Sequence, residues 1–397
     1  PVTPPPAGTW STATLERGRQ LAAAGDCAVC HTAHDGVTNA GGLAMDTPFG
    51  TLYTSNITPD AQTGIGNWSF AAFDRAMRQG ISREGRHLYP AFPYTAFRNI
   101  KEADMQALYA YLMSQPAVPS TPPANQMRFP FNVRTLMAGW NTLFLKQGEY
   151  QDDPARSAEW NRGNYLVNGL GHCAACHSPR NALGAEQGGT KFLSGAMVDG
   201  WEAPALAGLS KAPTPWTEQQ LFAYLRTGSS AEHGVAAGPM GPVVSELSTL
   251  PDDDLRAIAH YLASLEGEPA AQAQKAVARV PVTANLANGR RVFEGACAGC
   301  HSALDGGPEL FGVSPSMAAN TNVHSDRPDN LIKVILQGIG NPALSDLGYM
   351  PAFKDSLSDT QVSDLVAYLR SSFAADKAPW PPLGKQVAWL RANPGSH

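Results

Sequence analysis

The sequence is poor in charged residues and has no long hydrophobic run. Charged residues make up 16% of the 397 positions, and 34 acidic against 29 basic side chains give a formal net charge of -5. Nucleic-acid-binding proteins carry a clustered basic face, so no nucleic-acid partner is expected. The most apolar uncharged run, residues 135–145, is too short to cross a bilayer. Because the chain begins at Pro1 without the charged and apolar regions of a signal peptide, we expect any such peptide to have been removed.

No cysteine is left over for a disulfide, because all six belong to one repeated pattern, Cys-x-x-Cys-His. The two thiols of this pattern add to the vinyl groups of haem, and the histidine that follows is placed under the iron as its proximal ligand. A single Cys-x-x-Cys could instead be a thioredoxin-like redox pair, half of a zinc site or a disulfide. Three copies, each with a histidine, make these readings implausible. The predicted anchors and proximal ligands are Cys27, Cys30 and His31, then Cys173, Cys176 and His177, then Cys297, Cys300 and His301.

The sequence therefore predicts three covalently bound haem c groups. Thioether attachment of haem takes place outside the cytoplasm, so the expected compartment is the bacterial periplasm. Haem proteins of this kind carry electrons, and no arrangement of a nucleophile with a base and no phosphate-binding loop is evident in the chain.

The three motifs are spaced widely enough for one domain per haem, and the elements around them repeat. Each motif follows an amphipathic segment with an early glycine (Gly18, Gly163, Gly289), at which two helices are expected to cross closely. Each copy closes with a strongly helical segment. We expect a mainly α protein with three tandem cytochrome c-type domains and long Gly/Pro-rich loops. The expected domains are residues 1–123, 124–278 and 279–375, followed by a tail, 376–397, that lies across the surface.

The sixth iron ligands are predicted by comparing the loops before the closing helices. Met240 lies 12 residues beyond Gly228, and Met350 lies 12 residues beyond Gly338. A thioether on such a loop can reach the distal face of the haem and raise its potential.

In the first copy the same count from Gly80 ends at Phe92, which cannot bind iron. Either the first haem is five-coordinate or another side chain takes the place. His87 is the main candidate, although it could equally be a surface histidine; Met45, Met77 and His34 are weaker ones. Ligation by His87 would give a bis-histidine haem with a lower potential than the other two.

The chain resembles the tri-haem cytochrome c subunits of bacterial periplasmic and membrane-bound dehydrogenases from about Leu15 to Phe373. The resemblance rests on residues 47–60, on His87-Leu-Tyr-Pro-Ala-Phe-Pro-Tyr94 and on residues 173–184. One branch of this family serves quinoprotein alcohol dehydrogenases and flavin-dependent sugar dehydrogenases and typically has Met at position 92. The other serves molybdenum hydroxylases that oxidise aldehydes or N-heteroaromatics such as nicotinate or isoquinoline. Residues 87–94, 213–217 and 233–240 resemble the second branch.

The resemblance implies an electron-transfer subunit that is not itself an enzyme and has no catalytic residue. It would take electrons from a catalytic dehydrogenase subunit of the molybdenum hydroxylase class and pass them to an oxidase, a quinone or a small redox protein of the respiratory chain. Peripheral attachment to the outer face of the inner membrane is compatible with this role. Three alternatives stay open: a cytochrome subunit of a quinoprotein or flavin dehydrogenase, a haem enzyme such as a peroxidase or small-ligand binder at the first haem, and a free-standing electron shuttle.

Overall fold

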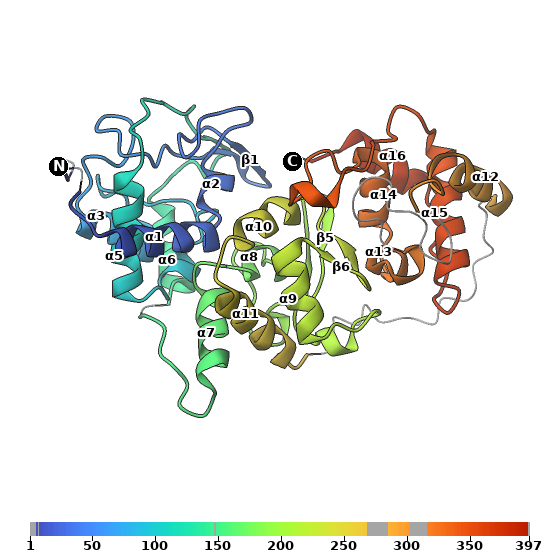
Figure 1. Ribbon diagram of the computed structural model, residues 1–397. Coiled ribbons are helices and arrows are strands. Elements are labelled where there is room, and N and C mark those ends of the chain that lie inside the picture. The colour runs from blue at the N-terminus through green and yellow to red at the C-terminus, as the bar shows by residue number, and fades with distance from the viewer. Residues whose placement is uncertain (1–4, 7, 147, 268–284, 302–315, 396–397) are drawn as a thin grey trace.

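The computed structural model describes residues 5–6, 8–146, 148–267, 285–301 and 316–395, and helices dominate it. The chain forms three lobes in sequence order (Figure 1): a blue and cyan lobe at the left, a green and yellow one in the middle and a red one at the right. Each lobe contains one Cys-x-x-Cys-His motif. The predicted mainly α class with three tandem copies is confirmed.

Each copy is built on a pair of helices, one that precedes the motif and one that closes the copy. The pairs are α1 (Thr12–Ala24) with α5 (Glu102–Ser114), α7 (Ala158–Asn168) with α11 (Asp252–Ser264), and α12 (Leu286–Ala296) with α15 (Asp359–Phe373). Side-chain caps start four of these six helices, at Ser11, Ser157, Asn285 and Ser358. Such caps satisfy backbone N–H groups that lack a partner in the first turn.

The helices of each pair cross at the predicted glycine. A Cβ atom on Gly163 would lie 2.6 Å from Cβ of Tyr261, and one on Gly289 would lie 2.7 Å from Cβ of Tyr368. On Gly18 it would overlap the carbonyl group of Ala107. All these separations are far below normal van der Waals contact, so the three crossings require glycine. The prediction of close helix crossings is confirmed.

A further helix in each copy ends at a glycine with a positive φ. These helices are α3 (Phe70–Gln79), α9 (Glu218–Thr227) and α14 (Asp329–Gln337), and the glycines that follow have φ of 63°, 73° and 68°. Glycine is favoured there because a side chain would strain this conformation. The predicted glycine ends are confirmed, and the loop after each glycine is called the distal loop of its copy.

Short elements complete the lobes. The first has the antiparallel sheet β1 (Ala44–Thr47), β2 (Gly50–Tyr53) and β3 (Gln126–Met127), in that order, with α2 (Cys27–Cys30), α4 (Tyr94–Phe97) and α6 (Leu136–Phe144). The second has α8 (Ala174–His177), α10 (Met240–Leu247), the hairpin of β4 (Ala196–Val198) with β5 (Trp201–Ala203), and that of β6 (Ser229–Ser230) with β7 (Gly234–Val235). The third has α13 (Thr321–His324) and α16 (Gly384–Ala392). Single 3-10 turns occur at Gly189–Lys191, Leu209–Lys211, Met317–Ala319 and Ser345–Leu347.

The first two copies share one hydrophobic core, whereas the third has its own. A single buried cluster joins side chains from Leu21 to Met113 with others from Tyr165 to Leu262. The separate cluster of the third copy runs from Phe293 to Leu390. The first two copies therefore form one unit, to which the third is docked.

Residues 126–145, here called the strap, pack on the first copy. Strand β3 pairs with β2, and Met137 and Trp140 of α6 are buried in one cluster with Tyr89 and Tyr94. The expected boundary at residue 123 separates the strap from this copy, and the packing supports placing the boundary near residue 145 instead. The expected boundary at 278 lies outside the described residues.

The C-terminal segment is part of the third core, so the expectation that it lies across the surface is wrong. Helix α16 packs against α14 and α15, and Leu383, Val387 and Leu390 are buried. Their spacing of four and three residues places them on one face of a helix. The prolines that precede this helix hid that pattern in the sequence.

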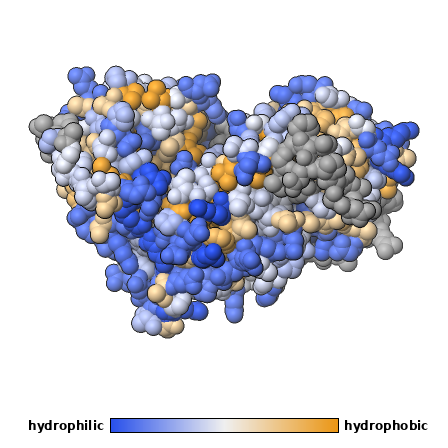
Figure 2. Space-filling model, in the orientation of Figure 1, coloured by the Kyte–Doolittle hydropathy of each residue, from blue (hydrophilic) through white to orange (hydrophobic). Residues whose placement is uncertain are grey.

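No helix in the described part of the chain is long and apolar enough to cross a membrane. The face of the molecule in Figure 2 is mostly hydrophilic, with apolar residues in small separate patches.

Candidate haem sites

The third copy holds a cavity that brings together its predicted anchors and ligands. Cys297, Cys300 and His301 line it, and so does Met350 from the distal loop. The rest of the lining is largely apolar and includes Phe293, Met317, Leu331, Ile335, Leu365 and Leu369. Two thiols, an imidazole and a thioether around an apolar cavity are the donor set of a covalently attached haem with His/Met iron. The residues of this copy fit that group.

In the first two copies the motif histidines are oriented for metal binding through one ring nitrogen. Nδ1 of His31 lies 2.6 Å from the carbonyl oxygen of Ser55, and Nδ1 of His177 lies 2.7 Å from that of Pro204. Burial lowers the pKa of both imidazoles, although these hydrogen bonds oppose the shift. A neutral ring that donates from Nδ1 to a carbonyl keeps its Nε2 lone pair for a metal. Both histidines therefore fit the role of a proximal ligand.

The first thiol of each motif is held in its protonated form, which separates these motifs from redox-active pairs. Burial raises the pKa of Cys27 and Cys173 to about 12 and that of Cys297 to about 11. Thioredoxin-like pairs need a lowered thiol pKa, so these thiols lack the feature on which that alternative depends. Among the described residues no cluster of His, Cys, Asp and Glu could hold a metal ion by itself, so a zinc site finds no support there.

The distal loops reveal a difference in register that a residue count does not show. Met350 pairs through its backbone with Ile339, directly after Gly338, and His87 pairs in the same way with Ile81, directly after Gly80. In backbone pairing, His87 is thus the counterpart of Met350.

The second copy has the register of the first. Val235 pairs with Ser229, directly after Gly228, and Met240 lies five residues beyond Val235, just as Phe92 lies five residues beyond His87. Phe92 is therefore the counterpart of Met240. Counting 12 residues from each glycine could not detect this difference, because only the hairpin pairings define the register.

The side chain of His87 has an unsatisfied polar atom. Its Nδ1 is buried and, within the described part of the protein, has no hydrogen-bond partner. Buried polar atoms are rarely left so, and an imidazole nitrogen without a partner can bind iron. The weaker candidates are placed less favourably, because Met77 is buried in the core of α3, Met45 packs against the cluster under the strap and His34 is exposed.

Met240 starts α10 and packs beside an apolar cluster at the boundary with the third copy. The ring of Trp201 lies directly against Gly238, two residues earlier, so that a Cβ atom on Gly238 would be 2.6 Å from the ring. Trp201 thus supports the loop that carries Met240.

Comparison with known proteins agrees with these geometries. Residues 15–116 and 161–266 match the family described as cytochrome c, and residues 284–369 match subunit III of cbb3-type cytochrome C oxidase. The chain belongs to the cytochrome c family. Domains of this family bind haem c covalently.

Several relatives of this cytochrome c are subunits of dehydrogenases. The chain is 72% identical to a nicotinate dehydrogenase subunit of Pseudomonas putida, a match that covers 100% of the chain and 33% of that protein. It is 38% identical to the gluconate 2-dehydrogenase cytochrome c subunit of Pantoea cypripedii, covering 96% of the chain and 90% of the relative. The fructose dehydrogenase cytochrome subunit of Gluconobacter japonicus is 36% identical, with 95% and 83% covered. The chain thus spans about a third of the length of the nicotinate dehydrogenase protein.

The first two motifs of the cytochrome lie near each other. Burial raises the pKa of Cys30 to about 12, with further contributions from the charges of Asp26 and of Cys176 in the second motif. The ring of Phe97 in the first copy is 5.6 Å from that of His172, which precedes Cys173. These contacts place the two attachment sites at one interface between the copies.

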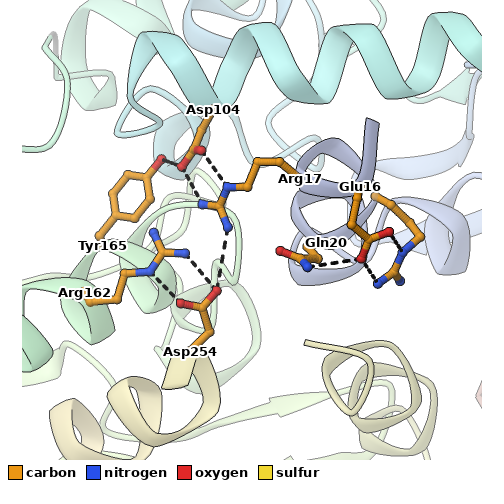
Figure 3. Close-up of polar contacts among 8 residues, drawn as sticks. Glu16, Arg17, Gln20, Asp104, Arg162, Tyr165 and Asp254 are labelled. Carbon is orange, nitrogen blue, oxygen red and sulfur yellow. Dashed lines mark hydrogen bonds and ion pairs between the residues drawn. The ribbon is translucent and has the colours of Figure 1, made fainter. Parts of the chain in front are cut away.

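Charged side chains fix the orientation of the first two copies (Figure 3). Arg17 of α1 donates two hydrogen bonds of 2.9 Å to Asp104 of α5, and Arg162 of α7 donates two of 2.7 and 2.8 Å to Asp254 of α11. Across the interface, Tyr165 donates to Asp104 at 2.8 Å, and Arg17 lies 3.7 Å from Asp254. Each copy thus supplies a partner for the carboxylate of the other.

The second and third copies meet through their distal loops. Ala236 and Val244 pack with Ala343 and Leu347 in one buried cluster, and residues 235 and 237 help to line the cavity of the third motif. Lys333 is fully buried at this boundary and donates to the carbonyl oxygen of Asp199 at 2.5 Å. The second copy therefore contacts the first on the side of its motif and the third on the side of its distal loop.

Proposed function

We propose that this cytochrome c is the electron-transfer subunit of a dehydrogenase complex and relays electrons through three covalently bound haem c groups. The observation that carries the proposal is the cavity of the third copy, where Cys297, Cys300, His301 and Met350 line one apolar space. The repeated arrangement of helix pair, motif and distal loop in the other two copies supports the same function for each.

Each residue of the three sites has a role in holding the group. The cysteines at 27, 30, 173, 176, 297 and 300 form thioethers, and His31, His177 and His301 bind iron on the proximal side. Met350, Met240 and His87 bind it on the distal side. The bound haem supplies a reversible one-electron couple at its iron. The chain supplies neutral imidazoles and apolar walls, which exclude water and tune that couple.

The order of the copies makes the relay linear. The second copy contacts the first near the two motifs and the third through the distal loops. Electrons therefore pass through the second site, and the first and third copies are the two ends at which a donor and an acceptor dock.

The donor is a catalytic dehydrogenase subunit of the molybdenum hydroxylase class. The high identity to a protein named as a nicotinate dehydrogenase subunit supports this choice over alcohol or sugar dehydrogenases. The acceptor is an oxidase, a quinone or a small redox protein of the respiratory chain. The complex works in the periplasm, at the outer face of the inner membrane.

The test is reduction of the purified cytochrome by its co-purifying dehydrogenase, followed by haem absorbance in a stopped-flow instrument. The proposal predicts that substrate reduces all three haems. Met350→Leu is expected to stop transfer beyond the third site while the other two still become reduced. Substrate oxidation that leaves all haems oxidised would refute the proposed relay.

A haem enzyme at the first site is the second candidate, because Phe92 occupies the position of Met240 in the first copy. Carbon monoxide separates the two functions. Binding to one haem of the ferrous cytochrome would favour the enzyme, and no binding favours ligation by His87.

A further inference from the structure

We propose that the strap, residues 126–145, holds the distal loop of the first copy in place and that Arg134 is the residue that positions His87. The inference rests on the proposed function, in which His87 is the sixth ligand of the first haem. It assigns a role to a segment that lies outside the helix pair, the motif and the distal loop.

Arg134 contacts the loop directly at the residue before Leu88. Its Nη1 donates a 2.9 Å hydrogen bond to the carbonyl oxygen of His87, and its guanidinium lies 4.6 Å from the centre of the Tyr89 ring. The hydrogen bond from a charged donor is strong and partly buried, so it fixes the backbone on which the His87 imidazole turns. The stacked Tyr89 limits the movement of the guanidinium.

Two tyrosines of the same loop are held by the strap as well. Tyr89 donates to the carbonyl oxygen of Phe131 at 3.0 Å, and Tyr94 donates to Oδ1 of Asn141 at 2.7 Å. Asn141 also donates to the carbonyl oxygen of Gln79, at the end of α3. The loop is thus fastened at its start, at its middle and at its end.

Tyr94 shows how tightly the end of the loop is packed. Its side chain is fully buried, its ring lies edge-on to that of Trp140 in the strap, and burial raises the pKa of its hydroxyl. A buried hydroxyl needs its hydrogen-bond partner, so Asn141 is required for this packing.

The first copy needs such a fastening more than the others do. The distal loops of the second and third copies cover each other, and each carries a methionine that we propose binds iron. The first loop has Phe92 at the position of Met240 and lies away from that contact. Its fastening comes from the strap, which keeps the loop closed over the haem and leaves His87 within reach of the iron.

The experiment uses the full-length haem-loaded cytochrome and compares Arg134→Ala, Arg134→Lys and His87→Ala with the parent. The readouts are the electron paramagnetic resonance of the ferric protein and carbon monoxide binding to the ferrous protein. Arg128→Ala is the matched control, because Arg128 is an exposed arginine of the same strap whose side chain makes no hydrogen bond to the loop in the described structure. Mass spectrometry confirms equal haem content in every variant.

We expect Arg134→Ala to convert part of the first haem to a high-spin form that binds carbon monoxide, as His87→Ala does completely. Arg134→Lys, which keeps a charged donor, should restore most of the low-spin signal, and Arg128→Ala should match the parent. Tyr89→Phe, which removes only one hydroxyl, should show a smaller effect in the same direction and serves if Arg134→Ala fails to fold.

Two results overturn the proposal in distinguishable ways. If His87→Ala changes the spectrum but Arg134→Ala and Tyr89→Phe do not, the strap does not position the ligand, and the proposed function stands. If His87→Ala changes nothing, His87 is not the ligand, and the assignment of the first site falls together with the role of the strap.

Discussion

Replacing Gly163 by alanine tests whether the helix pair of the second copy depends on a close crossing. Gly163 lies in α7 and faces α11, and an added Cβ atom would be 2.7 Å from the carbonyl carbon of Ala257 and 2.6 Å from Cβ of Tyr261. Two of the three nearest atoms belong to backbone, which cannot rotate away as a flexible side chain can. The helices must therefore move apart, and the core between them loses its packing.

The expected cost follows from two opposing effects. Overpacking a tight core costs up to about 3 kcal/mol, and a clash with backbone belongs at that end of the range. Alanine returns about 1 kcal/mol, because it is a better helix former than glycine. The net loss is about 2 kcal/mol, which lowers the melting temperature of a unit of this size by roughly 4–8 °C.

Thermal unfolding followed by circular dichroism measures this shift, and Gly139→Ala in α6 is the matched control. Gly139 has no heavy atom within 4 Å of an added Cβ and is exposed, so alanine should stabilise that helix by about 1 kcal/mol. If Gly163→Ala melts at or above the parent temperature, the crossing is not close and the reasoning is wrong. Equal destabilisation by the control would also refute it.

Three other predictions concern the interfaces and the distal sites. Asp254→Asn should weaken the union of the first two copies by about 3 kcal/mol, since it leaves Arg162 with a partly buried charge; calorimetry should then resolve two transitions where the parent shows one. Burial lowers the pKa of His233 from 6.5 to about 4. Below pH 6.5 the unfolded chain therefore binds a proton that the folded chain does not, and stability should fall as the pH drops from about 6.5 to 4. His233→Gln should flatten that part of the profile, and an unchanged slope would contradict the assignment. Phe92→Met should bring a thioether to the first haem and raise its potential in a redox titration; an unchanged or lower potential would count against it.

The sequence was sufficient to predict the repeated framework. Helix pairs, the crossing glycines and the helix-ending glycines all depend on local patterns, namely apolar spacing and the absence of a side chain. Gly18, Gly163 and Gly289 stand at equivalent places in those patterns, and the structure uses each of them in the same way.

Features that depend on tertiary contacts were not accessible from the sequence. The counts that related Met350 to Phe92 were equal, yet the backbone pairings relate Met350 to His87. The strap looked like a linker because its contacts with Tyr89 and Tyr94 bridge more than 40 positions in the chain. The helix α16 was hidden by its prolines, although Val387 and Leu390 carry a short helical pattern.

The mass of the intact protein, purified from the periplasm and denatured, tests the central claim most directly. Thioether bonds survive denaturation, so the account predicts one species that carries the mass of three haem groups. Substitution of both cysteines in one motif by alanine should remove one haem and no more. A parent mass with fewer than three haem adducts, or one explained by zinc, would contradict the account.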